Sequence, residues 1–451
     1  MSIPLPRTTD RHEQRSPGVR TMLAGPMGAC LANYDFGIFG TMSALVINKL
    51  FFPSLSPTAG TLAAFTAFAV GFLSKPLGGL LFGRIGDRFG RRTVVVSALL
   101  LMGAATIGIG ILPTYATIGV AAPILLTVLR LTQGLAVGGE WGGAASLAVE
   151  HAPRDRRGFW GGLVGIGGPI GSILGALTVL PLTAALSESD FLSWGWRIPF
   201  LLSALLVAAG LWIRLGVDES PVFRDEVAGR ARSEHDLLRV LTTNGKSMAL
   251  VFFLAGATVT GIYLLNTYTL SYAVNNVGLN RSTMLGFMTT AQIVAVFAGL
   301  GLLTRIDRIG LARLYQISAV ALAVMAWVLF AALDSGNSVV VVIALSLGQI
   351  AVNGMVVTTV PMYVLLFRPA DRVTGAGFSF KTSDAVLGGT TPLIAGLLVK
   401  SAGGASWVVA AYVTLLVLAA LTACAFGRRL LRDATTPEPD TAAATPEEVQ
   451  A

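Results

Sequence analysis

Residues 83–92 read GRIGDRFGRR, and a related stretch, LTRIDRIGLA, occupies residues 303–312. The two stretches align without a gap, which pairs Asp87, Arg88 and Gly90 with Asp307, Arg308 and Gly310. A second echo links PRDRRG at 153–158 with PADRVTG at 369–375. Repeats at equivalent places indicate two related halves, an arrangement typical of secondary transporters whose binding site lies between the halves.

Long runs without a charged residue surround these stretches. No Asp, Glu, Lys or Arg occurs in residues 93–129, 158–187, 247–280, 314–333, 335–367 and 401–427. A helix that crosses a bilayer needs about 20 such residues. The whole chain is 54% hydrophobic and 12% charged, whereas soluble domains are about 25% charged. This composition excludes an ordinary water-soluble enzyme and predicts an all-α, polytopic membrane protein.

We expect about 12 transmembrane helices in two six-helix bundles. The expected spans lie near 22–45, 58–83, 93–112, 118–147, 158–182, 196–216, 247–275, 283–304, 312–333, 338–367, 373–399 and 404–427. The longest polar connection divides them six and six. The predicted organisation is a cytoplasmic N-terminal tail (1–21), an N-terminal bundle (22–216), a cytoplasmic linker (217–246), a C-terminal bundle (247–427) and a disordered cytoplasmic C-terminal tail (428–451).

The basic residues predict the orientation of these spans. The chain has 32 Lys and Arg residues and a net charge of +8. With both termini inside, the outer loops and outer span ends hold only Lys49, Arg197, Arg281 and Lys400. This bias places both termini in the cytoplasm and the protein in the cell membrane. The basic excess therefore indicates topology beside anionic lipid, and no nucleic-acid partner is expected. Cys30 and Cys424, both within expected spans, are interpreted as packing residues.

Several motifs resemble a known family. Gly83, Asp87, Arg88, Gly90, Arg91 and Arg92 are similar to the loop signature of the major facilitator superfamily between spans 2 and 3. Four longer stretches resemble its metabolite:proton symporter family: YDFGIFGTMSALVINKLFFP (34–53), GFLSKPLGGLLFGRIGDRFGRR (71–92), LRLTQGLAVGGEWGGAASLAVEHAPRDRRGF (129–159) and GGTTPLIAGLLV (388–399). The resemblance implies the major facilitator fold and carriage of shikimate, 2-oxoglutarate, citrate, or proline and betaine. It leaves the substrate open.

Charged residues within the expected spans are the first candidates for function, because a charge in mid-membrane costs several kcal/mol. They are Asp35, Lys75, Arg130, Glu140, Lys381 and Asp384. Asp35 follows Tyr34 near mid-depth. Burial and a nearby cation act in opposite directions on such a carboxylate, which can then exchange a proton near neutral pH. We therefore interpret Asp35 as a proton-coupling residue; the alternative is a permanently ionised partner of Lys75 or Arg130.

Span 4 carries a polar face. Arg130, Gln133 and Glu140 recur at helical spacing, and nearby glycines make the helix slim enough for close packing. The fork of Arg130 suits a carboxylate, and the resemblance also places this arginine at the central cavity. Glu140 is interpreted either as a proton relay or as a residue that holds Arg130 and Lys75 in place.

Lys381 and Asp384 lie three residues apart in span 11 and therefore face the same way. They either form a local ion pair, or Lys381 meets substrate charge while Asp384 neutralises it until substrate arrives and exchanges a proton. Pro392 follows closely and removes a backbone hydrogen bond, so we expect this helix to be loosened.

Further polar and aromatic residues complete the expected cavity. With Tyr34, Lys75, Arg130, Gln133 and Lys381, the substrate-binding set comprises Tyr263, Asn266 and Asn353. Tyr268 and Thr358 are further candidates of the same kind in spans 7 and 10, and Gln292 in span 8 is a weaker one. Each of these residues could instead be a polar contact between helices.

The loop signature is assigned a gating role. The resemblance implies that it latches the two bundles on the cytoplasmic side when the cavity opens outward. The expected gating residues are Gly83, Asp87, Arg88, Gly90, Arg91, Arg92, Glu150, Arg156, Asp307 and Arg308. The alternative is that they only order the loops.

The chain also departs from the family. Relatives commonly carry Glu-Trp before Tyr-Asp in span 1, where this chain has Ala32 and Asn33, and Lys75 stands where Arg is usual. These changes put the coupling stoichiometry and the usual substrates in doubt. GIGGPIGS at 165–172 partly resembles a signature of proton-coupled drug exporters, or reflects close packing of small residues.

The leading hypothesis is proton-coupled import of a small organic acid, shikimate- or dicarboxylate-like, by alternating access. The sequence contains no P-loop for nucleotide-driven transport. Alternatives are a proline or betaine symporter, a proton antiporter that exports a metabolite or drug, and a non-transporting receptor. An enzyme is not expected, because His12, His151 and His235 lie in tails or loops and form no metal cluster. We expect no cofactor, no metal and a monomer, with substrate, protons and the lipid bilayer as partners.

Overall fold

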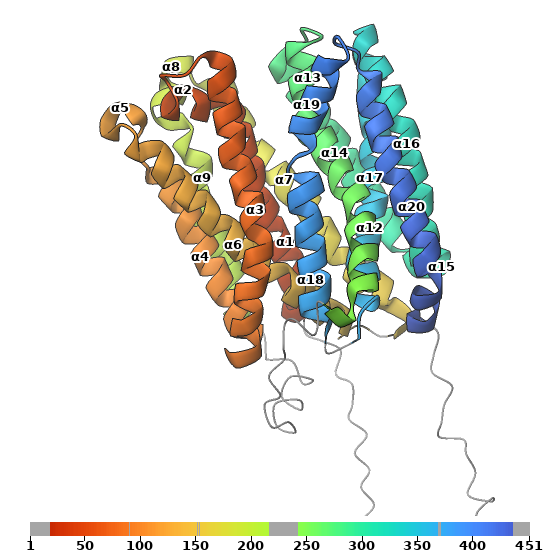
Figure 1. Cartoon of the computed structure of the whole chain (residues 1–451). Helices are drawn as coiled ribbons and strands as arrows, with labels where there is room; N and C mark the ends of the chain where they lie inside the picture. Colours follow the sequence, from red (N-terminus) through yellow and green to blue (C-terminus); the bar gives the residue numbers. More distant parts are fainter. Residues whose placement is uncertain are drawn as a thin grey trace, which may run out of the picture.

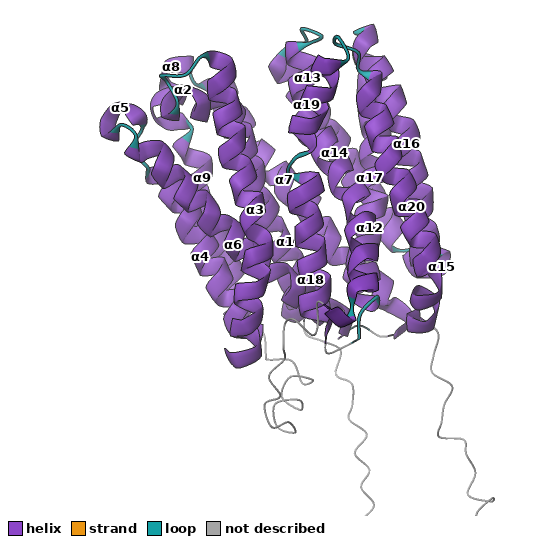
Figure 2. Cartoon of the chain, viewed as in Figure 1, coloured by secondary structure: helices purple, strands orange, loops and turns teal. Residues whose placement is uncertain are grey.

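The computed structural model of the chain describes residues 19–89, 91–150, 152, 154–215, 242–368 and 371–435. All regular elements in these ranges are helices (Figure 2). They form two bundles that lie side by side (Figure 1). We call the end where α1 begins and α20 ends the terminal end of the molecule, and the other the opposite end.

The N-terminal bundle consists of α1 (Val19–Met42), the π-helical turn η1 (Ser43–Ile47), α2 (Asn48–Phe51), α3 (Pro57–Phe89), α4 (Arg91–Ile111), α5 (Tyr115–Ile118), α6 (Ala121–Glu150), η2 (Arg154–Arg156), α7 (Arg157–Ala185), α8 (Glu188–Asp190), η3 (Phe191–Gly195) and α9 (Arg197–Leu215). The C-terminal bundle consists of α12 (Gly245–Tyr263), η4 (Leu264–Tyr268), α13 (Thr269–Asn275), α14 (Arg281–Leu303), α15 (Ile306–Ile309), α16 (Leu311–Ser335), α17 (Ser338–Leu365), α18 (Arg372–Ser383), η6 (Asp384–Gly388), α19 (Thr391–Ser401) and α20 (Trp407–Thr435).

Each expected span coincides with a helix or a run of consecutive helices. Within the described ranges, eight helices are long and apolar enough to cross a membrane, or up to 10 if each of two bent pairs is one span. Two shorter apolar helices, Thr66–Phe82 and Val96–Ile111, lie inside further expected spans. The polytopic, all-α fold is thus confirmed, and the count of 12 spans stays a prediction.

One boundary was wrong. Helix α20 continues to Thr435, so the disordered tail expected from residue 428 is helical in its first part. The loss of apolar periodicity after 427 marks the end of the hydrophobic span, and a helix can extend beyond it into water. The tail from residue 436, the N-terminal residues 1–18 and linker residues 216–241 lie outside the described residues.

Small residues bring helices of the N-terminal bundle close together. A Cβ added to Gly138 of α6 would collide with the carbonyl of Lys75 in α3. Added to Gly167 or Gly171 of α7, it would collide with the carbonyls of Pro26 or Cys30 in α1. The second contact accounts for the GIGGPIGS run as close packing, one of its two expected explanations. Because lipid offers apolar contacts as good as those between helices, such close approach is what holds membrane bundles together.

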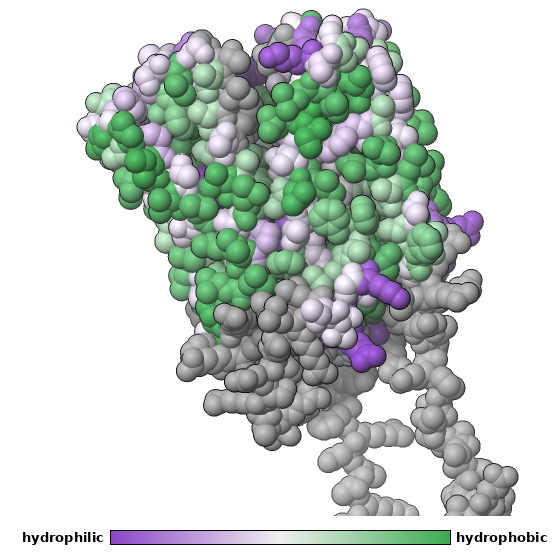
Figure 3. Space-filling model, viewed as in Figure 1, coloured by the Kyte–Doolittle hydropathy of each residue, from purple (hydrophilic) through white to green (hydrophobic). Residues whose placement is uncertain are grey.

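Large apolar side chains cover the outside of both bundles (Figure 3). Leu205, Phe297 and Leu415 are examples, with 68%, 71% and 65% of their surface exposed. A face of this kind fits the hydrocarbon region of a bilayer. The bundles contact each other through α7 with α14 and α17, and through α18 with α3 and α6, and they diverge towards the opposite end (Figure 1).

Candidate functional site

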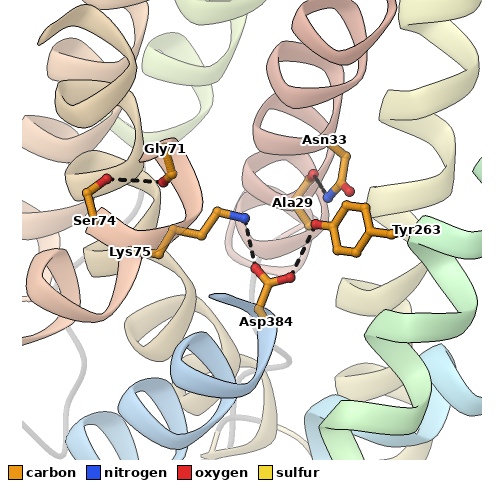
Figure 4. A network of polar contacts seen from close by, with 7 residues as sticks. All are labelled: Ala29, Asn33, Gly71, Ser74, Lys75, Tyr263 and Asp384. Carbon is orange, nitrogen blue, oxygen red and sulfur yellow. Dashed lines mark hydrogen bonds and ion pairs between the residues drawn. The ribbon is translucent and has the colours of Figure 1, made fainter. Parts of the chain in front are cut away.

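A buried ion pair joins the two bundles. Nζ of Lys75 in α3 lies 2.8 Å from Oδ2 of Asp384, and the two side chains are 5% and 6% exposed. The hydroxyl of Tyr263, at the end of α12, donates to Oδ1 of Asp384 at 3.2 Å (Figure 4). The Asp384 carboxylate therefore has a partner from each bundle.

Local helix geometry positions this pair. Helix α18 ends at Ser383, whose hydroxyl donates to the Phe252 carbonyl of α12, and Asp384 begins the π-helical turn η6. After a short turn, α19 begins at Thr391 with Pro392 in its first turn. The expected loosening of this helix is confirmed. On the other side, the Lys75 ammonium lies 3.6 Å from the centroid of the Phe72 ring, a favourable cation–π distance.

The local ion pair considered for Lys381 and Asp384 does not form. Asp384 binds Lys75 instead, and Lys381 makes no hydrogen bond or ion pair within the described residues, although it is 5% exposed. Its ammonium lies 4.9 Å from the centroid of the Phe380 ring. Helical spacing places Lys381 and Asp384 on one face, but the carboxylate turns to a cation from the other bundle.

A cavity of about 150 Å³ lies between the bundles beside the ion pair. Both halves of the chain contribute to its wall. Its polar and aromatic lining consists of Asn33, Phe36, Lys75, Glu140, Trp141, Ser172, Thr258, Tyr263, Asn266, Gln292, Gln349, Asn353, Thr359, Phe380, Lys381 and Asp384. The Asn353 Nδ2 is buried without a hydrogen-bond partner in the described part of the chain. Unused donors and buried cations suit an acceptor-rich ligand.

A second cavity of about 290 Å³ reaches towards the opposite end, where Arg281 begins α14. The two cavities share part of their wall, namely Asn33, Phe36, Ser172, Ile262, Tyr263, Asn266 and Gln292. Tyr263 thus stands at the junction of the cavities while it holds Asp384. A solute entering from the opposite end would meet this junction before the ion pair.

Arg130 and Asp35 belong to a separate, enclosed network in the N-terminal bundle. Nη1 of Arg130 donates to Oε1 of Gln133 at 2.7 Å, and Nε2 of Gln133 donates to Oγ1 of Thr106 at 2.6 Å. The Thr106 hydroxyl donates to Oδ2 of Asp35 at 2.6 Å. Asp35 and Arg130 are 1% and 0% exposed and line neither cavity. The direct ion pair with Arg130, which was the alternative interpretation of Asp35, is replaced by this relay of hydrogen bonds.

Some hydrogen-bonding capacity in this network is unused. Oδ1 of Asp35, and Nε and Nη2 of Arg130, are buried without a hydrogen-bond partner among the described residues. The Arg130 guanidinium lies 3.8 Å from the centroid of the Phe39 ring, a favourable cation–π distance. Roles for Asp35 in proton coupling, and for Arg130 and Gln133 in substrate binding, stay predictions. They would require a rearrangement that opens this network to the cavity.

Other expected residues fall in different places. The Tyr34 hydroxyl donates to the Pro199 carbonyl of α9 at 2.8 Å, and Tyr34 lines neither cavity. Tyr268 and Thr358 line neither cavity, whereas Gln292 lines both. Gln349 and Asn33 were missed. Gln349 donates to Asn266 at 2.8 Å, and its position one helical turn before Asn353 is the signal that identifies it.

Asp307 connects the bundles at the terminal end. Its Oδ1 and Oδ2 accept hydrogen bonds from the N–H groups of Gly158 and Phe159, at 2.9 and 3.1 Å. Burial raises the pKa of the Asp307 carboxyl above its ordinary value, while the two N–H donors act in the opposite direction. Arg156, two residues before Gly158, and Arg308, the residue after Asp307, are both exposed.

The remaining gating residues cannot be placed by their side chains. Gly90 lies outside the described residues, and for Gly83, Asp87, Arg88, Arg91, Arg92 and Glu150 the description covers only the helix backbone. Their gating roles stay predictions. No group of His, Cys, Asp and Glu within the described ranges could hold a metal ion.

Known proteins resemble this chain throughout most of its length. Residues 27–386 match the family described as Major Facilitator Superfamily. The shikimate transporter of Escherichia coli (strain K12) is 38% identical over 394 residues, or 85% of this chain and 89% of the relative. The proline/betaine transporter of Escherichia coli (strain K12) is 32% identical over 396 residues, or 85% and 78%. The structure of the proton:xylose symporter XylE from E. coli with bound 6-bromo-6-deoxy-D-glucose has a TM-score of 0.74, covering 91% of this chain and 95% of that one at 17% identity, which shows a common fold.

Proposed function

Because this chain belongs to the major facilitator superfamily, we propose that it is a proton-coupled symporter that imports a small organic acid by alternating access. The chain is a multi-pass membrane transporter, and not an enzyme. The substrate, the coupling ion and the direction are the proposed parts.

One observation supports the proposal that the substrate is an anion. The cavity between the bundles is lined by two buried lysines, Lys75 and Lys381, of which Lys381 has no anionic hydrogen-bond partner in the described residues. A buried cation without a paired anion is costly, and a carboxylate ligand would offset that cost. The likeness to the shikimate transporter, a carrier of a hydroxylated monocarboxylate, supports the same substrate class.

Protons are the proposed coupling ion because the membrane-embedded part of the chain holds several acids. Glu140 and Asp384 line the cavity, and Asp35 lies behind its wall. An acid that changes partner during the transport cycle can bind a proton on one side of the membrane and release it on the other. The sequence lacks a P-loop, which supports an ion gradient as the energy source.

We place the terminal end in the cytoplasm, because the basic residues gather in the tails and loops at that end. The Asp307 contact then closes the cytoplasmic side, and the second cavity faces outward. This arrangement is the one in which an importer would receive its substrate.

A second candidate is a zwitterionic osmolyte such as betaine. Trp141 and Phe380, which pack against each other with ring centroids 4.5 Å apart, both line the same cavity, and aromatic rings at a binding site attract a quaternary ammonium group. The 32% identical proline/betaine transporter supports this candidate.

The test is uptake into proteoliposomes of labelled shikimate, 2-oxoglutarate, citrate, proline and betaine, with and without an inward proton gradient. The proposal expects gradient-driven accumulation of a carboxylate, abolished by a protonophore. Accumulation of betaine or proline alone would favour the second candidate. Efflux driven by the inward gradient, with no accumulation, would show an antiporter and contradict import.

A further inference from the structure

Building on the anion transport proposed above, we propose that the substrate carboxylate displaces Asp384 from Lys75, so that the ion pair joining the bundles is exchanged for a substrate–Lys75 pair. The exchange makes the Lys75–Asp384 pair a lock that opens only when a carboxylate is present. Asp384, once released, carries the coupled proton.

The position of the pair gives it this role. Lys75 lies on α3 of one bundle and Asp384 on η6 of the other, 2.8 Å apart and almost fully buried. Separating the bundles here without a substitute would leave two uncompensated charges away from water. Breaking a buried pair by removing one partner is strongly destabilising, because the remaining charge is left without a counter-ion. The empty carrier is therefore held together at this point.

Lys381 is the first cation that the entering carboxylate meets. It lies one helical turn before Asp384, lines the same cavity, and makes no hydrogen bond or ion pair in the described ranges. Its electrostatic neighbours are Asp384 and Glu140. A carboxylate that reaches the cavity thus finds a cation available before it reaches Lys75, and from there it competes with Asp384.

The charges that line the cavity determine how many protons accompany the bound carboxylate. Its charged lining residues are Lys75, Lys381, Glu140 and Asp384, which sum to zero when all are ionised. One bound carboxylate adds one negative charge. A proton bound to the released Asp384 carboxylate restores the balance, and the Tyr263 hydroxyl is already in hydrogen-bond reach of that group. The expected stoichiometry at this site is one proton for each carboxylate that pairs with Lys75.

Tyr263 links the exchange to passage through the protein. It lines both cavities and bonds to Asp384, and a Cβ added to Gly388 would lie 2.8 Å from its ring. A shift of Asp384 or of η6 therefore moves the side chain that stands at the junction of the two cavities. Release of the lock and opening of the junction become one event.

The experiment compares shikimate and 2-oxoglutarate binding, by thermal shift and calorimetry, in wild type, Asp384→Asn, Lys75→Gln and the double variant. Asp384→Asn removes the competitor and keeps the cation, so it should bind carboxylate about tenfold more tightly or better, retain exchange, and lose gradient-driven accumulation. Lys75→Gln should bind at least about tenfold more weakly. The exposed Lys49–Glu188 pair, 2.7 Å long and within one bundle, is the matched control: Lys49→Gln should leave binding unchanged.

Two results distinguish the ways to fail. If wild type binds neither carboxylate, the proposed function and the exchange both fail. If wild type binds one and Asp384→Asn binds it no more tightly, the exchange alone is overturned. Should Asp384→Asn be too unstable to purify, the double variant decides, because it removes both members of the pair together: it should fold and bind carboxylate at least about tenfold more weakly than wild type, and binding at wild-type affinity would overturn the exchange.

Discussion

The carboxylate of Asp307 in the C-terminal bundle binds the first turn of α7 in the N-terminal bundle, with Oδ1 2.9 Å from the backbone nitrogen of Gly158. The N–H groups in the first turn of a helix have no partner within the helix, and an acid there also complements the helix dipole. One side chain therefore satisfies helix α7 and joins the bundles at the terminal end. The bond breaks whenever the bundles separate there.

Gly158→Ala should open the terminal end. A Cβ at this position would overlap the Asp307 carboxylate, and overpacking of this kind costs about 1–3 kcal/mol. A cysteine placed at Ala29, which lines the cavity near the terminal end, should be labelled faster by a membrane-impermeant maleimide from that side. Gly301→Ala is the control, since its Cβ would meet nothing within 4 Å. Equal labelling in both variants would show that the Asp307 contact does not close this end.

Asp307→Asn should change how stability depends on pH. The pKa of Asp307 is raised, mainly by burial, so the folded chain holds this proton more tightly than the unfolded chain. The stability that the Asp307 proton adds to the folded state is fully present below the ordinary aspartate pKa of about 3.9. It is lost as the pH rises through the raised pKa of the folded state. The melting temperature of wild type relative to Asp307→Asn should therefore rise between pH 7 and pH 4. A constant difference would show that the carboxyl titrates as an exposed aspartate.

Thr106→Val tests the enclosed network. Valine keeps the shape of threonine but removes the hydroxyl that joins Gln133 to Asp35. A buried polar group left without its partner costs about 1–3 kcal/mol, and the free energy of unfolding should fall by that amount. If Asp35 couples protons, gradient-driven accumulation should also fall more than exchange. Thr127→Val is the control and should change neither, because among the described residues the Thr127 hydroxyl bonds only to the Pro123 carbonyl of its own helix.

Gly138→Ala should damage the packing of α3 against α6. Its Cβ would collide with the backbone carbonyl of Lys75, and backbone atoms cannot move aside as a flexible side chain can. We expect a loss of folded protein after detergent extraction, measured by size-exclusion chromatography. At Gly79, on the facing helix, the nearest atom would lie at 3.5 Å, an ordinary contact. Gly79→Ala should therefore behave as wild type, and similar losses in both variants would contradict this account.

The local pattern of apolar and charged residues was sufficient to predict the positions of the helices and the charged candidate residues. Runs without charge predicted where the helices lie, because a bilayer tolerates only long apolar segments, and Pro392 marked the interruption between α18 and α19. Lys75, Glu140, Lys381 and Asp384 stood out for the same reason, and the structure places all of them around one cavity. Their roles remain to be tested by the experiments above.

The sequence by itself determined the apolar spans, the repeated halves and the small set of charges that the membrane must accommodate. Only the tertiary structure decided which charges meet. Asp384 lies three residues from Lys381 but binds Lys75, which is 309 positions away, and Arg130 reaches Asp35 through Gln133 and Thr106. Helical periodicity fixes neighbours within one helix. The partner of a side chain that faces another helix depends on how the two helices are rotated and packed against each other. Contacts along the whole length of the helices, such as those of Gly138 and Gly171, set this packing.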